Sequence, residues 1–308
     1  MSKIKSMLSP MNDLIFKKIF GSSMNKDIIV SFLSSILDIP NEEYESLTLL
    51  DTNTRIRRKK GKYGILDLKI KTKSGMLINI EMQVYPMEGM AQKILFYVSS
   101  MVIEQLGKKQ NYTEIKKVIS IAILNYNMYP DRKGYLRKHL IYDVTNNKPC
   151  NEYVESYIIE LLKLPKKSDG TLLYYWLKFL ISTKKEEFEM LKEKDPNIKS
   201  AVLLLEELSE DDEIRRLAEI EDMARRDEYD RIRTASRKGE EKGFRKGRKE
   251  GIEIGEAKGI IVGRQEGEAV GILKGKLDTA ASLLKIGMTV EQVAELSKLT
   301  VDQIRELI

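Results

Sequence analysis

The sequence contains only one cysteine and one histidine among its 308 residues. Cys150 has no second cysteine with which to form a disulfide, which favours a protein of the reducing cytoplasm. A single imidazole, on His139, argues against histidine-based zinc sites and against nucleases that use a histidine general base, which need more imidazoles than one. Any bound metal must therefore be held mainly by oxygen, so we expect Mg²⁺, or else Mn²⁺ or Ca²⁺.

Long apolar runs and nucleotide-binding loops are also missing. No run of 18 apolar residues occurs, so we expect no membrane span. The first residues, MSKIKSMLSPMNDLIF, have no apolar core, so we expect no signal peptide. Neither G-x-x-x-x-G-K-[ST] nor G-x-G-x-x-G is present, because GILKGKL has the wrong spacing and lacks the hydroxyl. The sequence therefore predicts no nucleotide cofactor.

Charge is unevenly spread along a chain whose net charge is +6. Residues 206–230 carry twelve acidic and four basic side chains, which is typical of an exposed helix with i,i+4 ion pairs. A basic run, by contrast, precedes the hairpin described below. It favours contact with nucleic-acid phosphates, and a solvated loop is the alternative. The run consists of Arg55, Arg57, Arg58, Lys59, Lys60 and Lys62.

The pattern of apolar residues predicts an α/β (α+β) domain followed by helices. Two helices are expected within 13–38, strands over 45–51, 66–84 (a hairpin), 116–126, 137–144 and 153–161, and a helix over 88–107. Everything from residue 171 onward has helical periodicity. We therefore expect a domain over 1–165, a helical region over 166–235, a charged segment over 236–277 and a small C-terminal unit over 278–308.

Ten glycines recur at every fourth position from Gly239 to Gly275. Each glycine within a helix costs about 1 kcal/mol relative to alanine, so this segment is a weak helix by itself. Two interpretations are open. In one, a partner closely approaches the backbone along the glycine stripe, so that the chain forms a homo-oligomer. In the other, the segment is a weakly helical, charged linker.

The C-terminal residues predict a three-helix unit of helix-turn-helix character. Thr289 precedes Gln292 and Thr300 precedes Gln303, which are two capping boxes, and Gly287 ends the preceding helix. Such a unit can read DNA or simply cap a helix. Few basic residues lie on its third helix, which favours the plain cap.

The segment LDLKIKTKSGMLINIEMQV, residues 66–84, predicts a hairpin with acidic residues on one face. A three-residue loop, Lys73-Ser74-Gly75, with glycine in the left-handed conformation is a favoured connection. It pairs residues whose numbers sum to 148. Leu68 then meets Ile80 on one face, and Asp67 lies opposite Glu81 on the other.

Directly opposed residues have Cβ atoms about 5 Å apart, where two carboxylates repel. A divalent cation between Asp67 and Glu81 reverses that interaction. Gln83 shares their face, and the Met82 carbonyl lies between Glu81 and Gln83, so several oxygens converge. The alternative is an ordinary polar face turned toward solvent.

These residues resemble a known family. The helix NDLIFKKIFG, then an aspartate followed after 13 residues by E-x-Q on a hairpin, then a helix and a buried strand, are similar to the PD-(D/E)XK nuclease superfamily. More narrowly, the chain resembles the recombination-promoting nuclease/putative transposase family, whose members carry the D…ExQ core and end in a glycine-punctuated tail with a GMTVEQVAELSKLT-like segment. The resemblance covers nearly the whole chain and implies a restriction-endonuclease-like fold.

The resemblance also implies residue roles. Asp67 and Glu81 become metal ligands together with the Met82 carbonyl, Gln83 stands at the usual lysine position, and Asp13 has an auxiliary role. The implied reaction is hydrolysis of DNA phosphodiester bonds by a metal-activated water. Glutamine cannot supply the charge of the superfamily's lysine. Strand parity suggests that Lys69 supplies it instead.

We therefore expect a cytoplasmic, Mg²⁺-dependent DNA endonuclease linked to recombination or mobile elements. One alternative is a DNA-binding, transposon-associated protein whose nuclease site has decayed. Another is an oligomerising interaction protein regulated by its C-terminal helices. No D-D-E spacing typical of a transposase is evident in these residues.

Overall fold

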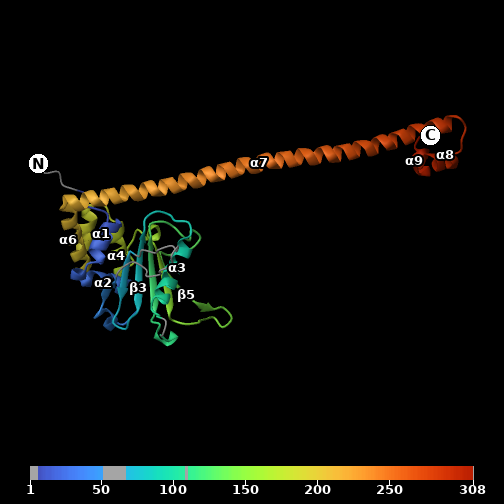
Figure 1. Cartoon of the computed structure of the whole chain (residues 1–308). Coiled ribbons are helices and arrows are strands. Elements are labelled where there is room, and N and C mark those ends of the chain that lie inside the picture. Colours follow the sequence, from blue (N-terminus) through green and yellow to red (C-terminus); the bar gives the residue numbers. More distant parts are fainter. Residues whose placement is uncertain (1–5, 51–66, 108–109, 308) are drawn as a thin grey trace. The chain divides into compact units, whose positions relative to one another are not determined.

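The structure is a computed structural model that describes residues 6–50, 67–107 and 110–307. Within this part of the chain, a six-stranded mixed sheet carries helices on both faces (Figure 1). The predicted α+β class is therefore confirmed. The strands are β1 (Thr48–Leu50), β2 (Leu68–Lys71), β3 (Leu77–Gln83), β4 (Val118–Leu124), β5 (Leu136–Leu140) and β8 (Val154–Glu160), with a separate small hairpin of β6 (Tyr142–Asp143) and β7 (Lys148–Pro149).

The helices follow the predicted order. Those of the N-terminal half are α1 (Asp13–Phe20), α2 (Lys26–Ile36) and α3 (Met90–Ile103). The later ones are α4 (Leu172–Ile181), α5 (Lys185–Lys192), α6 (Pro196–Glu210), α7 (Asp212–Lys285), α8 (Val290–Ser297) and α9 (Val301–Arg305). Short 3₁₀ turns cover Ser23–Asn25, Asn41–Tyr44, Tyr112–Glu114 and Leu161–Lys163.

The sheet has a parallel centre and antiparallel edges. Its strand order is β1-β2-β3-β4-β8-β5, with β3, β4 and β8 parallel to one another. All seven residues of β4 are buried, as its continuous apolar sequence predicts for a central strand. The carboxyl ends of the three parallel strands meet at one edge of the sheet, which is where α/β proteins bind ligands.

The hairpin of β2 and β3 has the predicted register. Leu68 pairs with Ile80 and Lys71 with Leu77, so the paired numbers sum to 148. The Gly75 N–H donates to the Thr72 carbonyl at 3.0 Å, and Gly75 has a φ of 92°, the left-handed conformation that the loop requires. The hairpin therefore presents Leu68 and Ile80 to one face and Glu81 to the other.

Helices cover the two faces of the sheet (Figure 1), and an apolar cluster lies between the helices and the sheet on each face. One packs α1, α2, α4, α5 and α6 against β2, β3, β4 and β8, with Trp176 and Phe20 fully buried at its centre. The other packs α3 against the opposite face. Ala218 of α7 belongs to the first cluster. The expected boundary at residue 165 therefore falls inside one compact unit, Met1–Tyr229, whose helices share its core.

Helix α1 is held in place by its two ends. The Asn12 side chain accepts the Ile15 N–H at 3.2 Å and caps the first turn. At the other end, a Cβ on Gly21 would lie 2.6 Å from the Lys17 carbonyl oxygen and 2.8 Å from Leu68 Cδ2, so only glycine fits. This close approach sets α1 against the strand that follows Asp67.

The second compact unit is Asp230–Ile308. The glycine-rich segment is helical, because Gly239 to Gly275 all lie within α7. Both predicted capping boxes are present, at Thr289 with Gln292 and at Thr300 with Gln303. Ala280, Val293, Leu299 and Ile304 form a small core of their own. In the described part of the chain, no helix is both long enough and apolar enough to cross a membrane.

Candidate active site

Asp67 and Glu81 lie together at the carboxyl-end half of β3. Asp67 directly precedes β2, and its Oδ2 accepts the Met82 backbone N–H at 2.8 Å. Glu81 lies on β3, on the face that α3 covers. Both side chains are buried. The hairpin register thus brings the two carboxylates predicted from the sequence to one place.

Lys93 of α3 is paired with Glu81. Its Nζ forms an ion pair with Glu81 Oε1 and donates a hydrogen bond to Gln83 Oε1 at 3.2 Å. Gln83 Nε2 in turn donates to the Tyr85 carbonyl at 3.2 Å. Gln83 therefore holds the lysine ammonium beside the carboxylate, with its own amide fixed by the backbone that follows β3.

The two carboxyls share an unfavourable electrostatic environment. Burial, and then repulsion from Asp13, raise the pKa of Asp67 to about 6, against the opposing effects of the Met82 N–H, Lys17 and Lys93. Burial, and then repulsion from Asp67, raise the pKa of Glu81 to about 7 even though Lys93 favours its ionised form. Burial and these two negative charges also raise the pKa of Tyr97 on α3.

Asp13, expected in an auxiliary role, also belongs to this group. Its Oδ2 pairs with Lys17 Nζ at 3.4 Å and with the Arg225 guanidinium of α7. Lys17 Nζ also lies 3.7 Å from Asp67 Oδ1, so that one lysine joins the two aspartates. Residues from α1, the hairpin, α3 and the start of α7 thus meet around Asp67 and Glu81.

Two buried oxygens at this place have no hydrogen-bond partner among the described residues, namely Glu81 Oε2 and Asp13 Oδ1. Unpartnered carboxylate oxygens beside a mutually repelling pair are suited to a hard divalent cation such as Mg²⁺. In the described part of the chain, no group of three or more histidine, cysteine or acidic side chains could hold a metal ion. Any ion here would therefore depend on Asp67, Glu81 and backbone oxygen.

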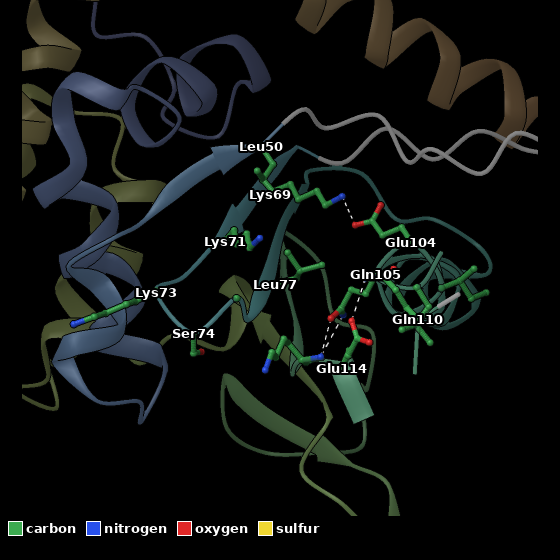
Figure 2. A pocket seen from close by; sticks show the side chains of 14 residues that line it. Leu50, Lys69, Lys71, Lys73, Ser74, Leu77, Glu104, Gln105, Gln110 and Glu114 are labelled. Carbon is green, nitrogen blue, oxygen red and sulfur yellow. Dashed lines mark hydrogen bonds and ion pairs between the residues drawn. The ribbon is translucent and has the colours of Figure 1, made fainter. Parts of the chain in front are cut away.

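Lys69 has the predicted face but a different partner. It is buried and forms an ion pair with Glu104, which follows α3. Figure 2 shows this pair at the edge of a pocket of about 940 Å³ whose lining also includes Leu77 and Lys116. Asp67 and Glu81 are not among its lining residues. The lysine that forms an ion pair with Glu81 is Lys93, whereas the ion pair of Lys69 is with Glu104.

Comparison with known proteins shows the family to which the chain belongs. A family model described as PD-(D/E)XK nuclease family transposase matches residues 10–235, which is well over half of the chain. The chain belongs to the PD-(D/E)XK nuclease family transposases. No curated protein and no solved structure matches it. The family is one of nuclease-type hydrolases, and the sheet with its flanking helices is the PD-(D/E)XK fold.

Two residues of the candidate site, Lys93 and Arg225, were not predicted from the sequence. Lys93 lies ten positions after Gln83, on a helix, so no strand pattern connects it with the E-x-Q segment. Arg225 lies over two hundred residues from Asp13, and only an acidic helix with scattered arginines hinted at it. The predicted basic run, Arg55 to Lys62, lies outside the described residues.

Proposed function

We propose that this chain is a Mg²⁺-dependent DNA endonuclease that hydrolyses phosphodiester bonds in the cytoplasm, in the service of recombination or mobile elements. The observation that carries the proposal is the buried pair Asp67 and Glu81, with Lys93 paired to Glu81. A family of nuclease-type hydrolases supports the reaction class. Mn²⁺ or Ca²⁺ are suited to the same oxygen ligands.

The cation would be held by Asp67, by Glu81 through its unpartnered Oε2, and by the Met82 carbonyl. When bound, a divalent cation lowers the pKa of a coordinated water and offsets the negative charge that builds on the phosphate. Burial and repulsion between carboxylates raise the pKa values of the two carboxyls, because both effects disfavour the ionised forms. A bound cation would offset both effects.

The remaining polar residues act on the substrate and on one another. Lys93 presents a positive charge beside Glu81, where a scissile phosphate would lie, and Gln83 holds that ammonium in place. Lys17 joins Asp13 to Asp67 and limits the repulsion between them. Asp13 therefore acts by positioning Lys17, which agrees with an auxiliary role.

The test is cleavage of supercoiled plasmid DNA by the purified chain with and without Mg²⁺. Wild type is expected to nick or linearise the plasmid only with the ion present. Asp67→Ala and Glu81→Ala should abolish cutting while circular dichroism shows the fold retained. If both variants cut as fast as wild type, the assignment is wrong.

A second candidate is a DNA-binding protein with a decayed nuclease site. It is favoured by one observation, that Lys93 already neutralises Glu81 while Arg225 and Lys17 neutralise Asp13. Ion pairs of this kind can stabilise a fold without any metal. This candidate predicts salt-dependent DNA binding by wild type with no Mg²⁺-dependent cutting.

A further inference from the structure

Glu160, a buried glutamate at the end of β8, fixes the loop that follows β4. Glu160 is fully buried and accepts the Tyr129 backbone N–H at 2.9 Å. Its other oxygen, Oε2, pairs with Arg137 of β5 and with Lys163 at 2.8 Å. A buried carboxylate bound by two cations and a backbone N–H is a fixed anchor, because each of its oxygens has a partner.

The two cations in turn hold the loop that follows β4. Lys163 Nζ donates to the carbonyls of Tyr129 and Arg132, the second at 2.8 Å. Arg137 Nη2 donates to the Lys133 carbonyl at 2.8 Å. The backbone from Tyr129 to Lys133 is therefore fixed by four hydrogen bonds. Glu160 accepts one from a backbone N–H, and its two partners, Arg137 and Lys163, donate the other three to backbone carbonyls.

This fixed loop presents two cations to solvent. The Arg132 guanidinium lies 4.5 Å from the centroid of the Tyr129 ring, a cation–π contact that orients it. Arg137 lies near the same ring, at 5.6 Å. The side chains of Arg132 and Lys133 are exposed, and neither forms an ion pair with any residue that the structure describes.

The loop adjoins the candidate active site on the same face of the sheet. Gln83 pairs with Leu124 of β4, and Leu124 pairs with Glu160 of β8, so the three form one row across the sheet. Neighbouring strands lie about 4.8 Å apart, which puts Glu160 about 10 Å from Gln83. Leu124 and Tyr129 both belong to the apolar cluster beneath α3, the face that carries Glu81.

We propose that Arg132 and Lys133, on the loop anchored by Glu160, bind a backbone phosphate of the DNA a few nucleotides from the bond that is cleaved. The inference rests on the proposed nuclease function and adds to it a second point of contact with the substrate. The Glu160 anchor lies about 10 Å from Gln83, which places this second contact within a few nucleotides of the cleaved bond.

The charge and rigidity of the loop fit a phosphate. Four cations and two anions make up the cluster, which comprises Asp131, Arg132, Lys133, Arg137, Glu160 and Lys163. Arg137 and Lys163 pair with Glu160, and the cluster as a whole keeps a net charge of +2 with Asp131 included, so that the exposed Arg132 and Lys133 can bind an outside anion. A guanidinium already oriented on an aromatic ring loses little freedom when it binds a phosphate oxygen.

The experiment compares DNA binding by full-length variants, with Ca²⁺ in place of Mg²⁺ to slow cutting and a short fluorescein-labelled duplex as the probe. Arg132→Ala/Lys133→Ala removes the two exposed cations, whereas Lys185→Ala/Lys199→Ala removes two exposed lysines of α5 and α6 as a charge-matched control. Fluorescence anisotropy measures Kd over a range of salt concentrations, and thermal melting verifies the fold.

The loop variant is expected to bind about tenfold more weakly, with a salt slope shallower by about one, because the two side chains share one phosphate contact and its loss removes about one unit of slope. Arg132→Lys should recover most of the affinity, and the cleavage rate at saturating DNA should stay within about twofold of wild type. The control variant should bind as wild type does.

Equal Kd and slope in the loop and control variants would overturn the proposal, as would a wild-type chain that does not bind the duplex. A fall in the saturating cleavage rate without a loss of affinity would do so too, because it would put the loop in the chemistry instead. The outcome is separate from that of the nuclease assignment. A chain that binds through Arg132 and Lys133 without cutting would refute the nuclease and keep the phosphate site.

Discussion

At the scale of single residues, Lys93 links the polar side chains of the candidate site. Its ammonium forms an ion pair with Glu81 and a hydrogen bond with Gln83, and Lys93 comes from a different element than either. The superfamily's lysine lies on the strand, where this chain has Gln83. In this chain the lysine paired with Glu81 is instead Lys93 of α3, whose ammonium donates a hydrogen bond to Gln83.

Lys93→Ala should lower the rate of Mg²⁺-dependent DNA cleavage about a hundredfold, because one electrostatic contact to the transition state is typically worth that much. The measurement is single-turnover cleavage at saturating DNA. Lys71→Ala removes a lysine that is exposed on β2 and should leave the rate unchanged. Wild-type cleavage by Lys93→Ala would remove that residue from the mechanism.

Glu81 makes stability depend on pH. Its pKa is raised from 4.5 to about 7, so between these values the folded chain holds a proton that the unfolded chain has lost. Stability contributed by this carboxyl therefore falls as pH rises through that window. The destabilisation of the folded chain by ionised Glu81 is therefore fully present above about pH 7 and absent below about pH 4.

Glu81→Gln should accordingly raise the free energy of unfolding at pH 8 by about 3–4 kcal/mol, since one pKa unit corresponds to about 1.4 kcal/mol. The gain should shrink toward zero by pH 4. Urea unfolding at several pH values measures both. Glu45→Gln, at an exposed glutamate, should change stability by less than about 0.5 kcal/mol throughout. A gain that is independent of pH would refute the electrostatic origin.

Among the elements, the first turns of α7 bind directly to the start of α1. Asn12 Nδ2 donates to the Ala218 carbonyl at 3.1 Å and to Asp222 Oδ1 at 2.8 Å, and Glu221 Oε2 accepts the Leu14 N–H at 3.1 Å. Beside them, Tyr229 stacks on Tyr85 with ring centroids 5.0 Å apart. This end of α7 is thus a structural part of the nuclease unit.

Arg225→Gln should lower the free energy of unfolding by about 1–2 kcal/mol, because it leaves buried Asp13 without its guanidinium partner. Adding Asp13→Asn should recover most of this loss, which a double-mutant cycle measures by thermal or urea unfolding. Arg233→Gln, two turns further along α7 and exposed, is the control and should have no effect. Additive losses in the double variant would mean that the two residues act independently.

The sequence predicted elements well where local chemistry determines them. The Lys73-Ser74-Gly75 loop settled the register of the hairpin, because glycine takes the left-handed conformation at little cost. Likewise, side-chain capping at Thr289 and Thr300 settled the C-terminal helices. Lys93, Arg225 and the Glu160 anchor could not be predicted, since each depends on contact between elements that are distant in sequence. The ion pair between Lys69 and Glu104 was not predicted either, because strand parity gives the face of a side chain and not its partner.

At the scale of the whole molecule, the chain consists of two compact units joined within α7, Met1–Tyr229 and Asp230–Ile308. The family match ends at residue 235, close to that division. A Cβ built on any glycine from Gly239 to Gly275 would meet nothing within 4 Å. The glycine stripe therefore packs against no other part of the chain that the structure describes. Of the two interpretations of the segment, we propose that a second copy of the chain approaches it.

Truncation after residue 235 should preserve the nuclease unit and convert an oligomer into a monomer. The truncated chain should melt cooperatively and cleave DNA within a few-fold of the wild-type rate, because every residue of the candidate site is retained. Light scattering after gel filtration measures the change in mass. Truncation after residue 211 removes Glu221, Arg225 and Tyr229 and should destabilise the unit. Loss of cleavage in the 235 truncation would assign the catalytic function to the tail instead.

The central claim is that Asp67 and Glu81 together hold the metal ion with which the chain cuts DNA. Its most direct test is the rate of single-turnover DNA cleavage as Mg²⁺ is added to wild type and to Asp67→Asn, with Ca²⁺ binding followed by calorimetry on the same proteins. Wild type should bind the ion and cleave, and Asp67→Asn should lose measurable binding and at least about a thousandfold in rate. Cleavage by Asp67→Asn at the wild-type rate would contradict the claim.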